Sequence, residues 1–449
     1  MKWTKLALAA LTCCGLMVQQ SAAQQTSRPI SIQEVTYNYS LDEDGADKSA
    51  AQKGKKSATQ KSASKAKCGC DDANGKGKGG LSFLNRMCVE HKAPWSLSDH
   101  GKKSKGHGIS ISGHTQLGYH TEGTNGDGVS NSFNEYPNRL QLHQQWLTVA
   151  KAAQGGGAAD WGFRMDWLYG TDGPNAQAVG NTPGDWDTGW DHGGHYGHAI
   201  PQLYVEVAMG DLRVKGGHFL SPLGYESVNS TENFFYSRSY SRGGESELDA
   251  PTYGGLPQTV TGVQADYTIS DNLTAHGGWV NGIDTGFGST DQSMFLGGVT
   301  LALANGMDVS YRLLSGTAYI DVVVYTHSIV VEKQLTDRLH SAFETVLFAD
   351  ADAEDSTAIN LNNYLFYDLN DCMALGLRSE WFDGGRDSEE FNAVTVGINY
   401  QATANLLLRP EVRVDNMHRD INAGRNGSTF HSAGRRDSTV FGFDAIWSY

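Results

Sequence analysis

Long apolar segments are missing from this 449-residue chain, apart from one near its start. Beyond the first 23 residues no run of 18 apolar residues occurs, which excludes membrane-spanning helices. Proline is scarce as well, with 10 residues, whereas 54 Gly, 19 Tyr and 10 Trp are present. That composition favours many glycine- and aromatic-rich β-strands over a helical enzyme.

Catalytic signatures are also missing. The chain contains none of the GDSL, GxSxG, HExxH or Walker patterns. Serine, histidine and aspartate are too common here for their co-occurrence to indicate a site. The sequence therefore predicts no enzyme and no cofactor, and a hydrolase stays open only as a minor alternative.

Cysteine is rare, and only Cys68, Cys70, Cys88 and Cys372 lie beyond the apolar leader. The Cys68-Gly69-Cys70 pair can bind a metal or oxidise with Cys88. No second CxxC and no paired histidine set accompanies it. We therefore interpret the four thiols as isolated cysteines that are compatible with export.

Histidine forms one cluster, in the string DHGGHYGH. It places His192, His195 and His198 three residues apart beside Asp191. Imidazole and carboxylate groups together are ligands that zinc and copper accept. The intervening glycines are typical of a flexible loop, so the sequence predicts no metal site and keeps these four residues as candidate ligands.

Residues 1–23 have the pattern of a secretory signal peptide. Two lysines precede an apolar core, and Ala23 ends a small-residue cleavage site. The next segment, residues 24–105, is rich in Lys, Ala, Ser and Gly, with 15 Lys and Arg against 9 Asp and Glu. It holds too little apolar surface to offset its ordering entropy, so we expect a mobile spacer.

The charge reverses in residues 106–449, which hold 18 Lys and Arg against 41 Asp and Glu. Apolar and polar residues alternate there in recurring segments, the period of two that a β-strand imposes. We predict about 16 strands, within a range of 14–18. They lie near 109–120, 138–150, 160–170, 199–209, 211–219, 258–269, 272–282, 292–303, 307–317, 320–335, 338–349, 359–369, 372–382, 391–402, 405–415 and 438–449.

The lengths of the connections alternate along the chain. Those after even-numbered strands have two or three residues, except for 151–159, whereas those after odd-numbered strands include 121–137, 171–198 and 220–257. A soluble β-protein has no reason to sort its loops in this way. Transmembrane barrels do, because short turns lie at one end and long loops at the other.

The last strand supports the same fold independently. Phe441, Phe443, Ala445, Trp447 and Tyr449 share one face, and the chain ends on an aromatic residue. In water such a face is an aggregation hazard, whereas against lipid it is what the solvent requires. The pattern also resembles the terminal signal by which barrels are recognised for membrane insertion.

One stretch carries a resemblance to a known family. The strings GHFLSPLGYE, NFFYSRSYS, VTGVQADYTIS and GGWVNGID, between residues 199 and 284, resemble the OmpL-like putative β-barrel porin family of bacterial outer membranes. The resemblance implies an all-β fold, a transmembrane antiparallel up-and-down β-barrel closed by the aromatic C-terminal strand. It implies a pore but no particular solute.

Charged residues occupy the polar phase of many strands, so we expect them to face the barrel interior. Burying so many ions dry would cost several kcal/mol each, which favours a water-filled lumen, although pairs that brace the wall are expected too. The loop 220–257 is the third long loop and is expected to fold inward, with Glu226, Arg238 and Arg242 setting a transverse field. The predicted pore-lining and constriction residues are Glu226, Arg238, Arg242, Arg213, Lys215, Glu206, Arg312, Arg378, Glu380, Arg409, Glu411 and Arg413.

These features predict an exported outer-membrane porin, a passive channel for small hydrophilic solutes or ions. Its expected domains are a signal peptide at 1–23, a mobile periplasmic segment at 24–105 and the barrel at 106–449. Expected partners are outer-membrane lipid, the barrel-assembly machinery through the C-terminal strand, and small solutes, with no nucleic acid; a homo-oligomer stays open. A non-conducting barrel that serves as wall anchor or adhesin is the alternative, and an outer-membrane hydrolase the minor one.

Overall fold

A computed structural model describes residues 95–97, 108–124, 133–155, 157–178, 186–187, 189–243, 256–287, 292–318, 323–350, 357–384, 390–419 and 437–449. The expected signal peptide, most of the expected periplasmic segment, and Cys68, Cys70 and Cys88 lie outside these residues. No helix within the described ranges is long and apolar enough to cross a membrane.

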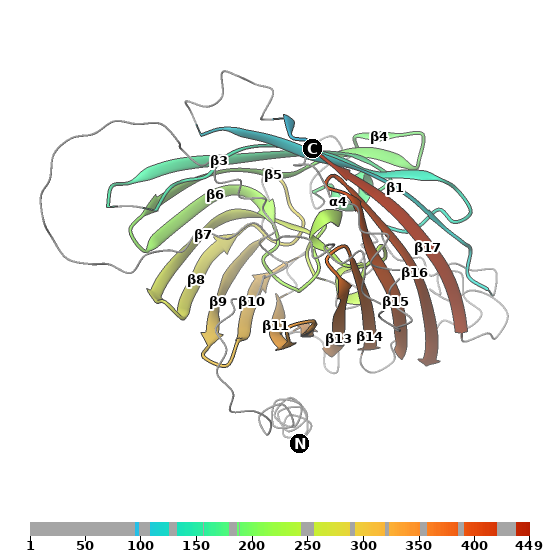
Figure 1. Cartoon of the computed structure of the whole chain (residues 1–449). Coiled ribbons are helices and arrows are strands. Elements are labelled where there is room, and N and C mark those ends of the chain that lie inside the picture. The colour runs from blue at the N-terminus through green and yellow to red at the C-terminus, as the bar shows by residue number, and fades with distance from the viewer. Residues whose placement is uncertain are drawn as a thin grey trace, which may run out of the picture.

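Sixteen long strands form one antiparallel ring (Figure 1), as the alternating pattern predicts. A seventeenth strand of two residues, β4, pairs only with the N-terminal end of β5 among the described strands. The strands are β1 Ser110–His120, β2 Gln141–Lys151, β3 Asp160–Gly170, β4 Asp191–His192, β5 Tyr196–Met209, β6 Leu212–Leu220, β7 Thr259–Ser270, β8 Leu273–Val280, β9 Ser293–Leu303, β10 Met307–Thr317, β11 Val323–Thr336, β12 Leu339–Asp350, β13 Thr357–Asn370, β14 Met373–Asp383, β15 Glu390–Thr403, β16 Leu406–Arg419 and β17 Asp437–Ser448.

The two ends of the barrel sequence close the ring. Strand β1 pairs with its sequence neighbour β2 on one side and with β17 on the other, where Tyr119 lies opposite Phe443. Because every long strand has two partners, the sheet has no free hydrogen-bonding edge, which a membrane requires. The C-terminal strand thus closes the barrel, as the sequence predicts.

The alternating residues separate into an apolar outside and a polar inside. On β5, Val205 and Val207 are 63% and 48% exposed, whereas Glu206 between them is 8% exposed. Phe441, Phe443 and Trp447 on β17 are likewise exposed on the outer face. The outer face therefore presents large apolar side chains around the ring, as a barrel in lipid requires.

Some details differ from the prediction. Strand β2 begins at residue 141 rather than 138, because a proline and polar residues precede it and periodicity marks strand ends poorly. The first three residues of the strand predicted at 320–335 lie outside the described residues. The pattern also missed β4, which is too short to show a period. Cys372 is disulfide-bonded, so its interpretation as an isolated thiol is wrong; alternation of neighbouring residues carries no information on pairing.

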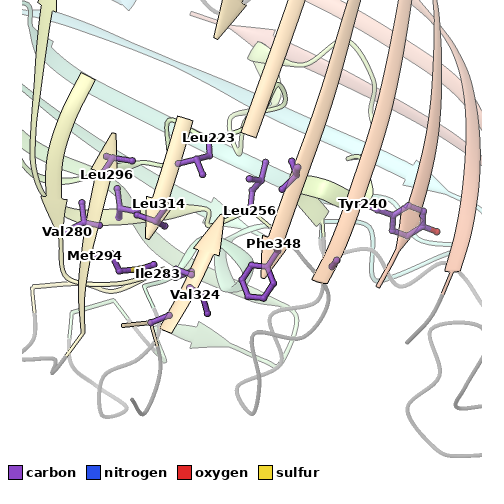
Figure 2. Packing of buried hydrophobic residues seen from close by; sticks show 14 of the residues in the cluster. Leu223, Tyr240, Leu256, Val280, Ile283, Met294, Leu296, Leu314, Val324 and Phe348 are labelled. Carbon is purple, nitrogen blue, oxygen red and sulfur yellow. The ribbon is translucent and has the colours of Figure 1, made fainter. Parts of the chain in front are cut away.

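Three short helical elements and a large buried apolar cluster accompany the strands in the described ranges. The helix α4, Gly173–Ala176, follows β3, and the 3-10 helix η3, Ser230–Glu232, and the helix α5, Tyr240–Gly243, interrupt the connection between β6 and β7. Leu223 and Leu256 from that connection form a buried cluster with Met294 and Leu314 of the wall (Figure 2). The hydrophobic core therefore joins the long connection to the barrel.

Candidate functional site

The connection between β6 and β7 lies inside the ring (Figure 1), and its described residues, 221–243 and 256–258, are called the inner loop here. Its three predicted constriction residues are almost fully buried, with exposures of 5% for Glu226, 1% for Arg238 and 3% for Arg242. The loop thus folds inward, as its length and aromatic content predict. Irregular backbone in this position needs hydrogen-bond partners, because few waters can reach it.

Carboxylates of the barrel wall supply acceptors for the N–H groups of the inner loop. Glu344 on β12 accepts from Tyr225 N at 2.8 Å, and Glu380 on β14 accepts from Tyr240 N at 2.8 Å. Glu411 on β16 accepts from two consecutive amides, Tyr236 N at 2.9 Å and Ser237 N at 3.1 Å. Three strands therefore hold the loop backbone through charge-assisted hydrogen bonds.

Arginines of the same wall supply donors for the carbonyl groups of the loop. Arg378 donates to the Ser237 carbonyl oxygen at 2.9 Å and Arg413 to that of Arg238 at 2.9 Å. Arg409 donates to the carbonyl oxygen of Asn233 at 2.7 Å. Both kinds of backbone group in the loop therefore find charged partners on β12–β17.

These wall charges also pair with one another. Arg409 lies 2.5 Å from Asp444, and Arg413 lies 2.8 Å from Asp415 and 3.0 Å from Glu380. Such pairing is what allows buried ions to persist, because each unpaired ion would cost several kcal/mol. On this side of the barrel the expected bracing of the wall is present, and the described charges are buried in pairs.

Arg378 links the wall to the loop carboxylate Glu226. Its Nη1 donates to Glu226 Oε1 at 2.7 Å, and its Nε lies 2.8 Å from Glu380 Oε1 without the angle of a hydrogen bond. Burial acts to raise the pKa of the Glu226 carboxyl, but the positive charge of Arg378 holds that pKa below its ordinary value. Glu226 is therefore ionised and fixed to the wall.

Arg238 and Arg242 bind the inner loop itself. Arg238 Nη2 donates to the Val228 carbonyl oxygen at 3.1 Å and to Ser230 Oγ at 2.9 Å. Arg242 donates to the carbonyl oxygens of Glu226 and Pro257, both at 2.8 Å. These contacts place both guanidinium groups within the body of the loop, and their expected effect on passing ions stays a prediction.

Consecutive aromatic residues of the loop fit over glycines of the wall, a feature that sequence reasoning missed. A Cβ atom on Gly376 would come within 2.3 Å of the Phe234 ring, and one on Gly442 within 2.6 Å of the Tyr236 ring. Only the absence of a side chain permits this approach. The sequence did contain a signal for this packing. Gly376 and Gly442 occupy inward-facing positions of strands whose other inward-facing residues are large.

A series of hydrogen bonds connects Tyr236, the last residue of this aromatic segment, to β2. Tyr236 Oη lies 2.8 Å from His143 Nε2, and His143 Nδ1 lies 3.1 Å from Asp172 Oδ1. Gln144 Nε2 donates to the other carboxylate oxygen of Asp172 at 2.7 Å. Sequence reasoning did not single out His143, since one histidine on an inward phase has no distinguishing pattern.

The opposite wall, β3–β10, carries the predicted residues that remain accessible. Arg213 on β6 pairs with Glu206 on β5 at 2.9 Å, and its side chain is 43% exposed. Lys215 and Arg312 are half-buried and lie on the same inward phase. The predicted set therefore divides into buried residues beneath the inner loop and, across from it, three half-buried cations beside the buried Glu206.

The histidine cluster does not assemble as a metal site would require. The rings of His192 and His198 lie 5.0 Å apart, but His195 packs edge-on against Tyr136, with ring centroids 4.2 Å apart. Among the described residues, no group of three or more His, Cys, Asp or Glu side chains is placed to hold a metal ion. The three-residue spacing therefore does not bring Asp191, His192, His195 and His198 together.

Comparisons with known proteins agree with this geometry. No curated protein matches the chain. Among solved structures, an anion-selective porin from Comamonas acidovorans is 13% identical over 76% of this chain and 99% of its own, with a TM-score of 0.50. The outer membrane channel DcaP of Acinetobacter baumannii is 12% identical over 80% of this chain and 100% of its own, with a TM-score of 0.48.

These identities are too low to transfer a solute, and the first of the two structures supports the porin fold alone. The family comparison is more specific, because its model covers nearly the whole barrel. The model described as "Putative beta-barrel porin-2, OmpL-like" matches residues 108–449. The chain therefore belongs to the OmpL-like porin-2 family of β-barrels.

Proposed function

We propose that this protein is a passive outer-membrane channel for small hydrophilic solutes or ions, and not an enzyme. The observation that carries the proposal is the division of the lumen. Inner-loop backbone covers the β12–β17 wall, whereas Arg213, Lys215 and Arg312 on the β3–β10 wall keep partly exposed charged groups. A passage for solutes then runs along the β3–β10 wall and is narrowed by the inner loop.

The roles of the predicted site residues differ under this proposal. Arg213, Lys215, Glu206 and Arg312 line the passage. The other residues set its width, since they hold the loop in place. These are Glu226, Arg238, Arg242, Arg378, Glu380, Arg409, Glu411 and Arg413.

Conductance in planar lipid bilayers tests the function. The purified full-length protein should insert as discrete steps of conductance that scale with salt concentration. A matched variant lacking residues 227–239 should give larger steps, because the obstruction is removed. Insertion without any conductance would favour the alternative of a wall anchor or adhesin, and turnover in an ester-hydrolysis assay would favour the hydrolase.

Cell-surface labelling tests the proposed orientation. Long loops lie outside and short turns in the periplasm, so a cysteine at Asp191 should react with an impermeant reagent on intact cells. A cysteine at Asp271, in the turn between β7 and β8, should react only after the outer membrane is opened. Reaction at Asp271 on intact cells would contradict the orientation.

The remaining assignments are also proposals. A signal peptide cleaved near Ala23 exports the chain, the assembly machinery binds the aromatic C-terminal strand, and identical chains can associate. Residues 24–105 are not needed for the barrel, since no strand of the ring comes from them. A chain that starts at Lys105 behind a signal peptide should still insert and show heat-modifiable migration on gels, and loss of that band would show that the segment belongs to the fold.

A further inference from the structure

Cys372 is the one cysteine in the part of the chain that the structure describes, and it is disulfide-bonded. Its partner is therefore one of the cysteines outside that part. Cys13 and Cys14 lie in the signal peptide that the proposed export removes. The exported chain then offers three partners, all of which precede the barrel: Cys68, Cys70 and Cys88.

The position of Cys372 is fixed by hydrogen bonds in the short turn that joins β13 to β14. Its N–H donates to Asn370 Oδ1 at 3.0 Å, and its carbonyl oxygen accepts from Gln401 N on β15 at 2.9 Å. The residue is buried. A disulfide at Cys372 therefore attaches the preceding segment to the end of the barrel where the short turns lie.

Trp95 lies at the same end of the barrel. Its backbone binds the side chain of Asn405, in the turn between β15 and β16. Gln401, whose N–H binds Cys372, lies near the end of β15, just before that turn. Trp95 and Cys372 are therefore held at neighbouring turns of the ring.

Chain length distinguishes the three possible partners. Cys88 comes seven residues before Trp95, whereas Cys70 comes 25 residues before it and Cys68 comes 27. Seven extended residues span about 23–25 Å, and neighbouring hairpin turns are two strand spacings apart, or about 10 Å. Cys88 therefore reaches Cys372 easily. Because the probability of closing a flexible loop falls as the 3/2 power of its length, Cys88 is favoured over Cys70 by roughly sevenfold.

The proposed export also supplies the chemistry, because disulfides form and persist outside the reducing cytoplasm. The oxidant is a thiol–disulfide oxidoreductase. One cysteine thiolate attacks the disulfide of that enzyme, and the second thiolate then displaces the enzyme from the mixed disulfide. The two cysteines lose two protons and two electrons in total, and the disulfide of the oxidoreductase is reduced to two thiols.

Resting on the proposed export, we propose that Cys88 forms the disulfide with Cys372, and that this bond and the Trp95–Asn405 contact fasten the N-terminal segment to the turn end of the barrel. Residues 24–87 hold 11 Lys and Arg against 7 Asp and Glu. The link therefore keeps a basic segment at this end of the barrel, although no strand of the ring comes from it.

Peptide mapping of the full chain tests the pairing. The protein is purified from outer membranes with its free thiols blocked and is digested without reductant. One linked species should contain Cys88 and Cys372, and a reductant should split it into two peptides. A link from Cys372 to Cys68 or Cys70, or a free thiol at Cys372, would overturn the assignment.

A protease site inserted between residues 98 and 105 tests the attachment independently. After cleavage, the N-terminal fragment should stay with the barrel on non-reducing denaturing gels and leave it when a reductant is added. Cys68→Ser with Cys70→Ser should behave in the same way, whereas the matched variant Cys372→Ser should release the fragment without reductant. Heat-modifiable migration checks that each variant is folded.

Two results on these gels would contradict the proposal. Release of the fragment from the unmodified pairing without reductant would show that no covalent link exists. Release from the Cys68→Ser and Cys70→Ser double variant would assign the link to one of those cysteines instead of Cys88. Both results leave the channel proposal standing, since the contacts of the inner loop do not involve Cys372, and the conductance steps should be unchanged in every variant.

Discussion

The side-chain amide of Asn405 binds both backbone groups of Trp95. Its Oδ1 accepts from Trp95 N at 2.9 Å, and its Nδ2 donates to the Trp95 carbonyl oxygen at 2.8 Å. Asn405 lies in the short turn between β15 and β16, and the Trp95 ring lies 6.2 Å from that of the terminal residue Tyr449. The first described residue of the chain is thus attached to the end of the barrel where the short turns lie.

Asn405→Ala should release Trp95 from this turn. Losing the two hydrogen bonds costs about 1–2 kcal/mol locally, so the Trp95 amide should exchange with solvent roughly tenfold faster. Hydrogen exchange read by mass spectrometry measures this. Asn272→Ala, in the equivalent turn between β7 and β8, is the control and should leave exchange at Trp95 unchanged; equal effects from both would contradict the contact.

Glu411→Ala should loosen the inner loop. Two consecutive loop amides, at Tyr236 and Ser237, lose their acceptor inside the lumen, a loss of about 2–4 kcal/mol. Conductance traces should become noisier, and loop amides should exchange faster. Glu135→Ala removes an exposed carboxylate from the long loop between β1 and β2 and serves as the control. Quiet traces in a folded Glu411→Ala protein would show that this anchor is dispensable.

The Arg409 and Asp444 pair predicts a non-additive pattern of stability. Asp444→Asn leaves a buried guanidinium without its counter-charge and should destabilise the barrel by about 3–5 kcal/mol. Arg409→Met with Asp444→Leu removes both charges and should recover much of that loss. Urea unfolding in detergent micelles measures each variant. Additive losses in the double variant would mean that the two charges do not depend on each other.

Gly376→Ala should displace the Phe234 ring, because the new Cβ would lie 2.3 Å from a ring atom. Overpacking of this kind costs about 1–3 kcal/mol and should lower the midpoint of heat modification. Gly277→Ala is the control, since a Cβ there would meet nothing within 4 Å. A Gly376→Ala protein as stable as Gly277→Ala would mean that Phe234 does not pack on β14.

The long loop after β3 should become less stable as pH rises. The Asp187 carboxylate accepts from Ala178 N at 2.9 Å and Ile200 N at 2.7 Å, yet burial raises its pKa to about 6. The folded loop therefore holds this proton more tightly than the unfolded chain does. The cost of ionisation is absent below about pH 4, grows between pH 4 and 6, and reaches about 3 kcal/mol above pH 6.

Hydrogen exchange at Ala178 and Ile200, corrected for intrinsic rates, should accordingly show less protection at pH 7 than at pH 5. Asp187→Asn carries no charge at either pH and should abolish the difference. The same difference in the Asp187→Asn variant would assign it to another group.

Regular features of this protein could be predicted from its sequence, and irregular contacts could not. Alternation along β5 and loop length by parity are local properties of the chain, so they predict the ring and its strand number. The inward path of the inner loop follows from its length and aromatics. What Glu411 or Arg378 binds depends on a loop more than 130 positions away, and no local pattern encodes that partner.

The same limit applies to individual residues. The positive charges of Arg238 and Arg242 suit a pore constriction. Their guanidinium groups donate to carbonyl groups of their own loop, however, and composition cannot reveal such contacts. The spacing of His195 from its neighbours is compatible with a metal, but only the fold shows that its ring turns toward Tyr136. Gly376 looks neutral in sequence, yet a distant phenylalanine requires it.

The pairing of β1 with β17 also bears on how the protein is made. Strand β1 leaves the ribosome long before its partner β17, because the other strands of the ring lie between them in the sequence. Until β17 has been synthesised, the ring cannot close. A chain that stops before residue 437 therefore keeps two strand edges without hydrogen-bond partners, and such edges promote aggregation. Synthesis of β17 is thus a checkpoint built into the topology, and chains truncated before it should be degraded rather than accumulate as smaller barrels.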